Sequence, residues 1–284
     1  MPVYFSTGGY KNSNTINVVE DLIANGLNYI ELSGTSYVPD NIKKLTEFKS
    51  SARFQIHNYF PPPKNPFVIN LASMNQEIYK KSLDHIFNAI ESCEKINSSH
   101  YSFHAGFLCD IDVSEIGKSV KKKLLQNKED SISLFIDRLK LVSDKAKKHN
   151  INIMLENNVL SKKNLEIFGK NPLLMCDVND SLDIINNTPD NIKLLVDVAH
   201  LKVSANSLNF KCEDFFSKCE NLIAGYHLSD NDGLSDSNST YDENAWFWKY
   251  LNKNLDYYSI EVYNLDFEQI SRLYSLTKKK LNIL

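Results

Sequence analysis

The sequence predicts an α/β fold in which eight parallel strands, alternating with helices or long crossings, close into a (β/α)8 barrel. Apolar runs such as Ile192–His200 lack polar alternation, which is typical of parallel strands covered on both faces. Segments with helical periodicity lie between these runs, and eight such units are the number that closes a barrel. The 284 residues show no composition break or linker. We therefore expect one domain spanning residues 1–284.

The first half of the chain supplies four of the expected strands. A Gly/Ser/Asn-rich loop after the first strand can cap the next helix, which stops at Asn25-Gly26. The run Pro61-Pro62-Pro63 follows the third strand and cannot continue it as helix or strand. The expected strands are 3–6, 27–34, 52–60 and 100–107, and the expected helices are 15–25, 41–50 and 75–97.

The second half repeats the pattern with longer polar insertions. A lysine-rich loop at 121–123 precedes the next helix, and a polar excursion at 161–190 separates the fifth and sixth strands. A long polar loop follows the seventh strand, before an aromatic segment that we expect to be helical. The expected strands are 151–158, 192–200, 222–230 and 257–264, and the expected helices are 130–148, 181–187, 213–219, 245–251 and 267–279.

Composition excludes several classes of protein. With 42% hydrophobic and 24% charged residues, the chain has the composition of a soluble globular protein. A formal net charge of -3 argues against a nucleic-acid partner. The five cysteines are scattered without CxxC spacing, which argues against disulfides and a thiolate zinc site. No signal-peptide pattern or membrane-length apolar run is present, so we expect a cytoplasmic protein without a membrane partner.

Four potential metal ligands end four successive strands: Glu156, Asp197, His227 and Glu261. Barrel closure would bring these strand ends onto one axis. Three carboxylates and one imidazole suit one divalent ion, namely Mn²⁺, Zn²⁺, Co²⁺ or Mg²⁺. The alternative for each residue alone is that it finishes a strand and faces solvent. Four together favour a metal site.

Three further histidines lie at the same positions in the pattern. His57 and His104 end the third and fourth strands, and His200 lies three residues after Asp197. We expect these imidazoles to line the same cavity, where they would bind substrate or, for His57 and His104, hold a second metal. A structural hydrogen-bonding role for each remains the alternative.

The segments LLVDVAH, YHLSDNDG, MLENN and SIEVY, with FHAGF and IHNYFPPP upstream, resemble the xylose-isomerase-like TIM-barrel superfamily. That superfamily includes sugar phosphate isomerases and epimerases and endonuclease IV, and the resemblance covers essentially the whole chain. It implies a divalent metal held by Glu156, Asp197, His227 and Glu261. It also implies that Glu156 and Glu261 act as a catalytic pair, moving a proton beside a carbonyl through a metal-bound enediolate.

The resemblance implies a metal-dependent isomerase or epimerase acting on a sugar, sugar phosphate or related polyol. His57, His104 and His200 would hold hydroxyls or a phosphate of that substrate. Many such epimerases carry an arginine just after the H-x-S-D step, whereas Asn231, Asp232 and Gly233 follow here. The substrate's identity therefore stays open.

Three other functions remain alternatives. An endonuclease IV-like phosphodiesterase would use His57, His104 and Glu156 for a second metal, although the expected D-x-H pair is absent after the His227 strand. A dehydratase could use the same metal, and a binding barrel would perform no chemistry. The sequence also leaves open a homo-oligomer.

Overall fold

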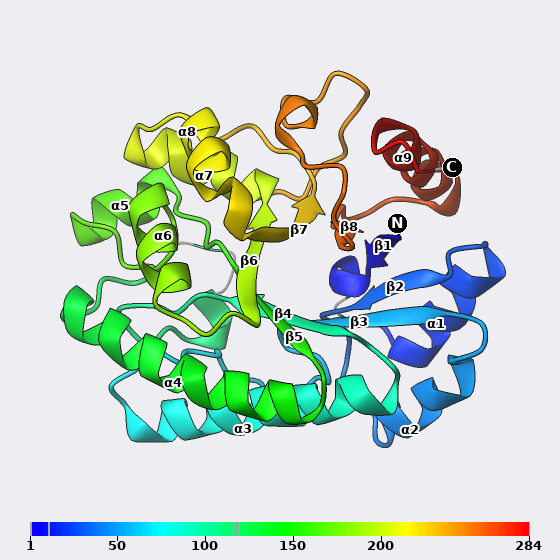
Figure 1. Ribbon diagram of the computed structural model, residues 1–284, viewed down its shortest axis with the longest axis horizontal. Helices are drawn as coiled ribbons and strands as arrows, with labels where there is room; N and C mark the ends of the chain where they lie inside the picture. Colours follow the sequence, from blue (N-terminus) through cyan, green and yellow to red (C-terminus); the bar gives the residue numbers. More distant parts are fainter. Residues whose placement is uncertain (1, 11, 116–117, 119, 284) are drawn as a thin grey trace.

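The computed structural model describes residues 2–10, 12–115, 118 and 120–283, and its strands form a closed parallel barrel surrounded by helices (Figure 1). Each strand pairs with the next in sequence, and β1 closes the barrel against β8 through pairs such as Val3 with Tyr258. The predicted (β/α)8 barrel is therefore confirmed. The strands are β1 (Val3–Ser6), β2 (Tyr29–Leu32), β3 (Arg53–His57), β4 (His100–His104), β5 (Asn152–Glu156), β6 (Ile192–Asp197), β7 (Ile223–Leu228) and β8 (Tyr258–Ile260).

The outer layer consists of α-helices and short 3-10 turns. Side chains of Asn, Ser or Asp accept hydrogen bonds from the first backbone N–H groups of most of these helices, as is usual for helix N-caps. The helices are α1 (Thr15–Ala24), α2 (Asn41–Leu45), α3 (Gln76–Lys95), α4 (Lys128–Lys148), α5 (Lys162–Phe168), α6 (Val178–Asn186), α7 (Val198–Leu208), α8 (Cys212–Cys219) and α9 (Phe267–Lys280). The 3-10 turns are η1 (Thr7–Gly9), η2 (Thr46–Phe48), η3 (Val113–Glu115), η4 (Glu220–Leu222) and η5 (Trp248–Tyr250).

Three predicted segments are corrected by the structure. The sixth strand ends at Asp197 rather than His200, and the unpredicted helix α7 begins at the next residue. A second unpredicted helix, α5, occupies part of the polar excursion at 161–190. The segment 245–251 is not an α-helix, because its backbone makes i→i+3 bonds, such as Tyr250 N–H to the Phe247 carbonyl, that form only the turn η5.

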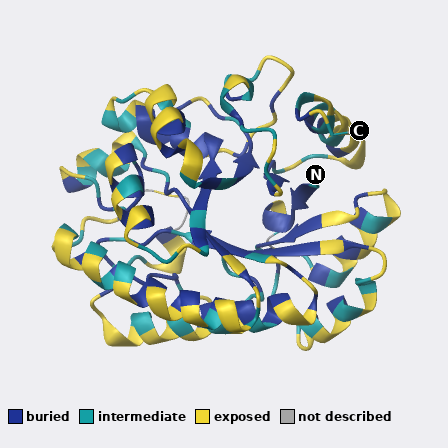
Figure 2. Cartoon of the chain, in the orientation of Figure 1, coloured by how far each residue is buried: buried dark blue, intermediate teal, exposed yellow. Residues whose placement is uncertain are grey.

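Most strand residues are buried, and Figure 2 shows the strands at the centre of the molecule mainly in the colour for buried residues. The main apolar core lies between the barrel and its helices. A smaller cluster of Tyr4, Met154, Leu195 and Tyr257 contains residues two positions before Glu156 and Asp197 on the same strands. Because strand side chains alternate between faces, these residues point into the barrel, and the acidic residues beyond them do the same.

All five cysteines are free, in agreement with the absence of a disulfide framework. Among the described helices, none combines the length and the apolar character needed to cross a membrane.

Candidate metal centre at the barrel mouth

The predicted site residues lie at the carboxyl ends of their strands. Parallel strands in a closed barrel all end on the same side, so neighbouring strand ends converge. The last residues of β3, β4, β5 and β6 are His57, His104, Glu156 and Asp197, His227 is the penultimate residue of β7, and Glu261 directly follows β8.

Glu156 lies at the middle of the cluster and is fully buried. Its Oε2 atom is 3.3 Å from His57 Nε2 and 3.2 Å from His104 Nδ1. Its Oε1 atom is 3.1 Å from His227 Nδ1 and 3.6 Å from His200 Nδ1. One carboxylate is therefore surrounded by four imidazoles from four different elements.

Glu261 contacts the same ring nitrogen of His227 as Glu156 does. Its Oε2 atom is 2.9 Å from His227 Nδ1, and its Oε1 atom accepts a 2.9 Å hydrogen bond from the Tyr263 hydroxyl. Gly8 leaves room for this carboxylate, because a Cβ atom there would be 2.9 Å from Glu261 Oε1. Two carboxylates thus face a single ring nitrogen of His227.

Possible ligand atoms within 4.8 Å of one another form two groups among the described residues. The first comprises His57, Glu156, His227 and Glu261, and the second comprises His104, Glu156 and His200. The first group contains three of the four predicted metal ligands together with His57, which the sequence had assigned to substrate or a second metal. Glu156 belongs to both groups, so it could bridge them.

Asp197, the fourth predicted ligand, belongs to neither group. Its Oδ1 atom accepts a 2.8 Å hydrogen bond from His200 N–H at the start of α7, while Oδ2 lies 3.9 Å from His200 Nε2. The Asn157 side chain holds the Asp197 backbone on both sides, at 2.8 and 3.2 Å. Burial raises the pKa of Asp197 to about 7, with His200 opposing the shift and the nearby Glu156 adding to it.

Four contacting residues were missed by sequence reasoning. Asp236, in the loop after β7, places Oδ2 3.2 Å from His200 Nε2, so this loop does contribute one carboxylate to the cluster. Glu31 on β2 places Oε2 2.8 Å from His227 Nε2, the ring nitrogen that Glu156 and Glu261 do not contact. The remaining two are tyrosines, Tyr257 beside Glu31 and Tyr263 beside Glu261. A carboxylate within the apolar run of β2 was the one signal available.

In this cluster, neighbouring groups of opposite charge offset the free-energy cost of burying charged side chains. Burial opposes charge on Glu156, yet the surrounding imidazoles, His104 first, hold its pKa well below the usual value. Burial also opposes charge on His227, but Glu31 and other carboxylates raise its pKa well above normal. Burial lowers the pKa of His104 to about 4 despite the nearby Glu156. The buried charges that stabilise one another are therefore those of His227 and its carboxylate neighbours, whereas His104 is neutral at physiological pH.

The residues fit a divalent cation. Buried polar atoms are normally hydrogen-bonded, but Glu156 Oε2, Asp197 Oδ2 and His104 Nδ1 have no hydrogen-bond partner among the described residues. Glu156 Oε2 lacks one even though two ring nitrogens lie within 3.3 Å. Carboxylate oxygens and imidazole nitrogens without thiolates are the donors that Zn²⁺, Mn²⁺ and Co²⁺ accept.

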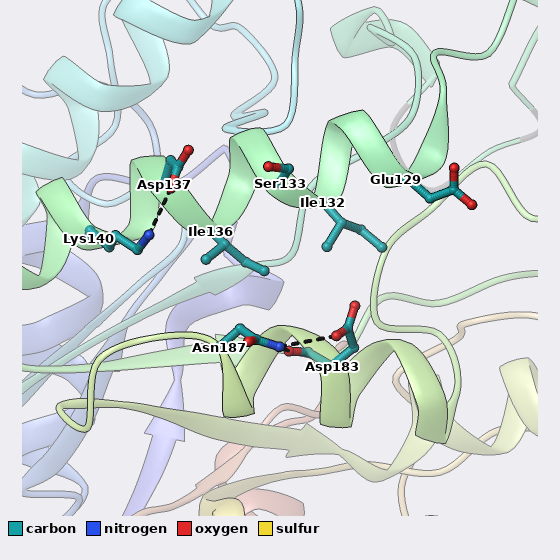
Figure 3. Close-up of a pocket in the computed structure, with 8 residues that line it drawn as sticks. All are labelled: Glu129, Ile132, Ser133, Ile136, Asp137, Lys140, Asp183 and Asn187. Carbon is teal, nitrogen blue, oxygen red and sulfur yellow. Dashed lines mark hydrogen bonds and ion pairs between the residues drawn. The ribbon is translucent and has the colours of Figure 1, made fainter.

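A cavity of about 380 Å³ lies elsewhere, between α4 and α6 (Figure 3). It is lined by Ile132, Ile136 and acidic side chains such as Asp137 and Asp183, of which Asp137 pairs with Lys140 at 2.8 Å. No histidine lines it. We place the candidate site at the barrel mouth, because the buried titratable groups and orphaned polar atoms gather there.

Comparisons with known proteins agree with this architecture. Residues 19–257 match a family model described as xylose isomerase-like TIM barrel. An uncharacterized protein of Methanocaldococcus jannaschii is 24% identical over 211 residues, which are 73% of this chain and 62% of that protein. A probable endonuclease 4 of Thermoplasma volcanium is 20% identical over 181 residues, which are 62% of this chain and 53% of that protein. The chain therefore spans less than two thirds of the length of these relatives.

Solved structures share the fold over nearly the whole chain. A D-tagatose 3-epimerase-like protein has a TM-score of 0.75 and 21% identity, with 100% of this chain and 98% of that chain covered. The IolI protein with a bound zinc atom has a TM-score of 0.70 and 15% identity, with 99% and 98% covered. At these identities the likeness establishes a common fold.

Proposed function

Because this chain belongs to the xylose isomerase-like TIM-barrel family, we propose that it is a divalent-metal-dependent epimerase or isomerase of a sugar, sugar phosphate or related polyol. The observation that carries this proposal is the pair of carboxylates around His227, with Glu156 Oε1 at 3.1 Å and Glu261 Oε2 at 2.9 Å from Nδ1. The likeness to a D-tagatose 3-epimerase-like protein supports the same choice.

In the proposed reaction, one glutamate removes the proton from the carbon beside the substrate carbonyl, and the C–H electron pair forms an enediolate. The other glutamate returns a proton to the opposite face, which inverts that carbon. A bound divalent cation would supply Lewis-acid stabilisation of the developing oxyanion. The proposed holders of that cation are the predicted ligands Glu156, Asp197, His227 and Glu261.

Glu156 and Glu261 have different surroundings, which suits one glutamate to remove a proton and the other to return one. The imidazoles around Glu156 hold its pKa low, so it stays ionised over the physiological range. Glu261 accepts the Tyr263 hydroxyl bond, which fixes one oxygen and leaves the other facing the cluster. His57 is oriented by a 2.9 Å contact between Nδ1 and the Ser102 hydroxyl. We propose that His57, His104 and His200 bind substrate oxygens.

Solvent deuterium exchange tests the proton transfer. Ketose and aldose sugars would be screened with added Mn²⁺, Co²⁺, Zn²⁺ or Mg²⁺, and deuterium incorporation beside the carbonyl measured for wild type, Glu156→Gln and Glu261→Gln. We expect incorporation by the wild type and a loss of about 10² to 10⁴-fold in at least one variant. Full retention of the substrate hydrogen, or both variants within about threefold of wild type, would contradict the glutamate-pair mechanism.

A metal-dependent phosphodiesterase is the second candidate. Its support is the second ligand group, His104, Glu156 and His200, which shares Glu156 with the first and has Asp236 beside it. Paired metal ions bridged by a carboxylate stabilise both the attacking and the leaving oxygen of a phosphodiester. Two tightly held metals per chain and hydrolysis of bis-p-nitrophenyl phosphate would favour this candidate, whereas one metal and no hydrolysis would favour the epimerase.

A further inference from the structure

Glu31 is a fully buried carboxylate that the proposed proton transfer does not use. It lies on β2 and contacts the imidazole of His227 on the side opposite Glu156 and Glu261. Its Oε2 atom is 2.8 Å from His227 Nε2, while the other ring nitrogen, Nδ1, faces the two catalytic carboxylates at 3.1 and 2.9 Å. The ring thus separates one carboxylate from the other two.

The hydrogen-bond donors around Glu31 determine which ring nitrogen carries the proton. Tyr257 donates its hydroxyl to the same Oε2 atom, so this oxygen acts as an acceptor. If His227 Nε2 were unprotonated, two lone pairs would meet at 2.8 Å, which is repulsive. Nε2 therefore donates to Glu31. By the same argument Nδ1, which lies 3.1 and 2.9 Å from Glu156 and Glu261, also carries a proton in the metal-free protein. A cation held by these two carboxylates would replace the proton on Nδ1, while Glu31 keeps the one on Nε2.

The surroundings hold Glu31 and Tyr257 in this arrangement. The Tyr257 ring stacks on Tyr4 with centroids 5.4 Å apart. It also fills space left by Gly225, where a Cβ atom would be 2.9 Å from the Tyr257 Cβ atom. The residue paired with Glu31 on the neighbouring strand β3 is Gln55. Gln55 forms hydrogen bonds with the Tyr4 hydroxyl and the His100 backbone N–H, and not with His227. Of this cross-strand pair, Glu31 is therefore the residue that contacts His227.

We propose that Glu31, supported by Tyr257, is a positioning residue that keeps the proton of His227 on Nε2 and so turns Nδ1 toward the metal as a ligand. This inference rests on the proposed metal centre. Histidine ligands commonly donate their second nitrogen to a carboxylate, which fixes the tautomer and increases the ligand's basicity. Glu31 would therefore act through His227 and not on the substrate.

The variant Glu31→Gln tests the proposal, because it preserves the shape while its amide N–H can donate to Nε2 and favour a proton on Nδ1. We expect Zn²⁺ affinity, measured by competition with a chromogenic chelator, to fall about 10 to 100-fold in Glu31→Gln. Tyr257→Phe should change affinity in the same direction by a smaller factor. The matched control Asp180→Asn makes the same acid-to-amide change at a buried carboxylate on α6, where Asp180 pairs with Lys128, and its Zn²⁺ affinity should stay within about threefold of wild type.

Nitrogen-15 NMR of the histidine rings gives a readout that general destabilisation would not produce. The His227 signals are assigned by their loss in His227→Gln. We expect Nε2 to be protonated in the wild type with and without Zn²⁺, and to lose its proton in Glu31→Gln. An unprotonated Nε2 in the wild type, or unchanged Zn²⁺ affinity in Glu31→Gln, would overturn the inference. If wild type binds no Zn²⁺ or Mn²⁺, the proposed metal centre fails, and the role of Glu31 is then decided by whether Nε2 of the metal-free protein loses its proton in Glu31→Gln.

Discussion

His85 shows how a single buried imidazole should make folding depend on pH. It lies on α3 with 7% exposure, packed against Tyr59 and Phe67 with ring centroids 6.3 and 5.9 Å away. Burial lowers its pKa from 6.5 to about 4. The unfolded chain therefore takes up this proton at a higher pH than the folded protein. Stability is fully present above about pH 6.5 and falls as the pH drops toward about 4.

The first prediction concerns His85→Gln, which removes the titrating ring. Urea unfolding of the metal-free protein would be measured at about pH 7 and about pH 4.5. Between these values we expect wild type to lose about 2 kcal/mol more stability than the variant, since each pKa unit corresponds to about 1.4 kcal/mol. Equal losses in both proteins would show that His85 does not contribute to acid unfolding.

At the residue scale, part of the candidate site could be predicted from sequence. Glu156, His227 and Glu261 were found because each interrupts or ends an apolar strand, and the barrel brings such ends together. Asp236 could not be identified, because its loop contains several acidic residues and only the folded path shows which one meets His200. Glu31 interrupts the apolar run of β2 as His227 interrupts that of β7, but only closure of the barrel through β8 and β1 shows that these two side chains meet.

At the scale of elements, the junction between β6 and α7 explains a difference between sequence and structure. The run after Asp197 is apolar, so it reads as continued strand, whereas the Asp197 side chain caps a buried helix that starts at Val198. Apolar periodicity alone does not distinguish a buried strand from a buried helix. Helix α5 was missed for another reason, since its seven residues are too few to show a helical repeat.

Asp197 is both the N-cap of α7 and a proposed metal ligand, and these two roles can be tested separately. Asparagine and aspartate cap helices about equally well, so Asp197→Asn should keep the stability of the metal-free protein within about 0.5 kcal/mol, while Asp197→Ala should lose about 1 kcal/mol. If Asp197 is a ligand, as the sequence predicts, both variants should bind Zn²⁺ more weakly. Urea unfolding and chelator competition provide the two measurements. Unchanged Zn²⁺ affinity in Asp197→Asn would leave Asp197 only its role as a cap.

At the scale of the whole molecule, the large apolar core lies outside the barrel, and the polar cluster lies inside it. The apolar core between strands and helices stabilises the fold, and the interior holds Tyr4, Met154, Leu195 and Tyr257 beneath a polar cluster. The eight-unit alternation could be predicted because each strand must be covered on both faces, which leaves a strong apolar pattern. Interior contacts could not, since they join residues as far apart in sequence as Glu31 and Tyr257.

The buried carboxylates lead to the last prediction, which concerns the stability of the entire barrel. Glu31, Glu156 and Asp197 are fully buried, and each lies within 4 Å of a histidine ring nitrogen. A cation that binds only the folded protein stabilises it by mass action, by about 2.7 kcal/mol at 100 times its dissociation constant.

For a chain of this size we expect Zn²⁺ or Mn²⁺ to raise the thermal midpoint by about 5 °C over the chelator-treated protein. Calorimetry should show this rise in the wild type and in Glu47→Gln, which changes an exposed acid, and not in the double variant Glu156→Gln/Glu261→Gln. A rise of equal size in the double variant would mean that the metal binds elsewhere on the molecule.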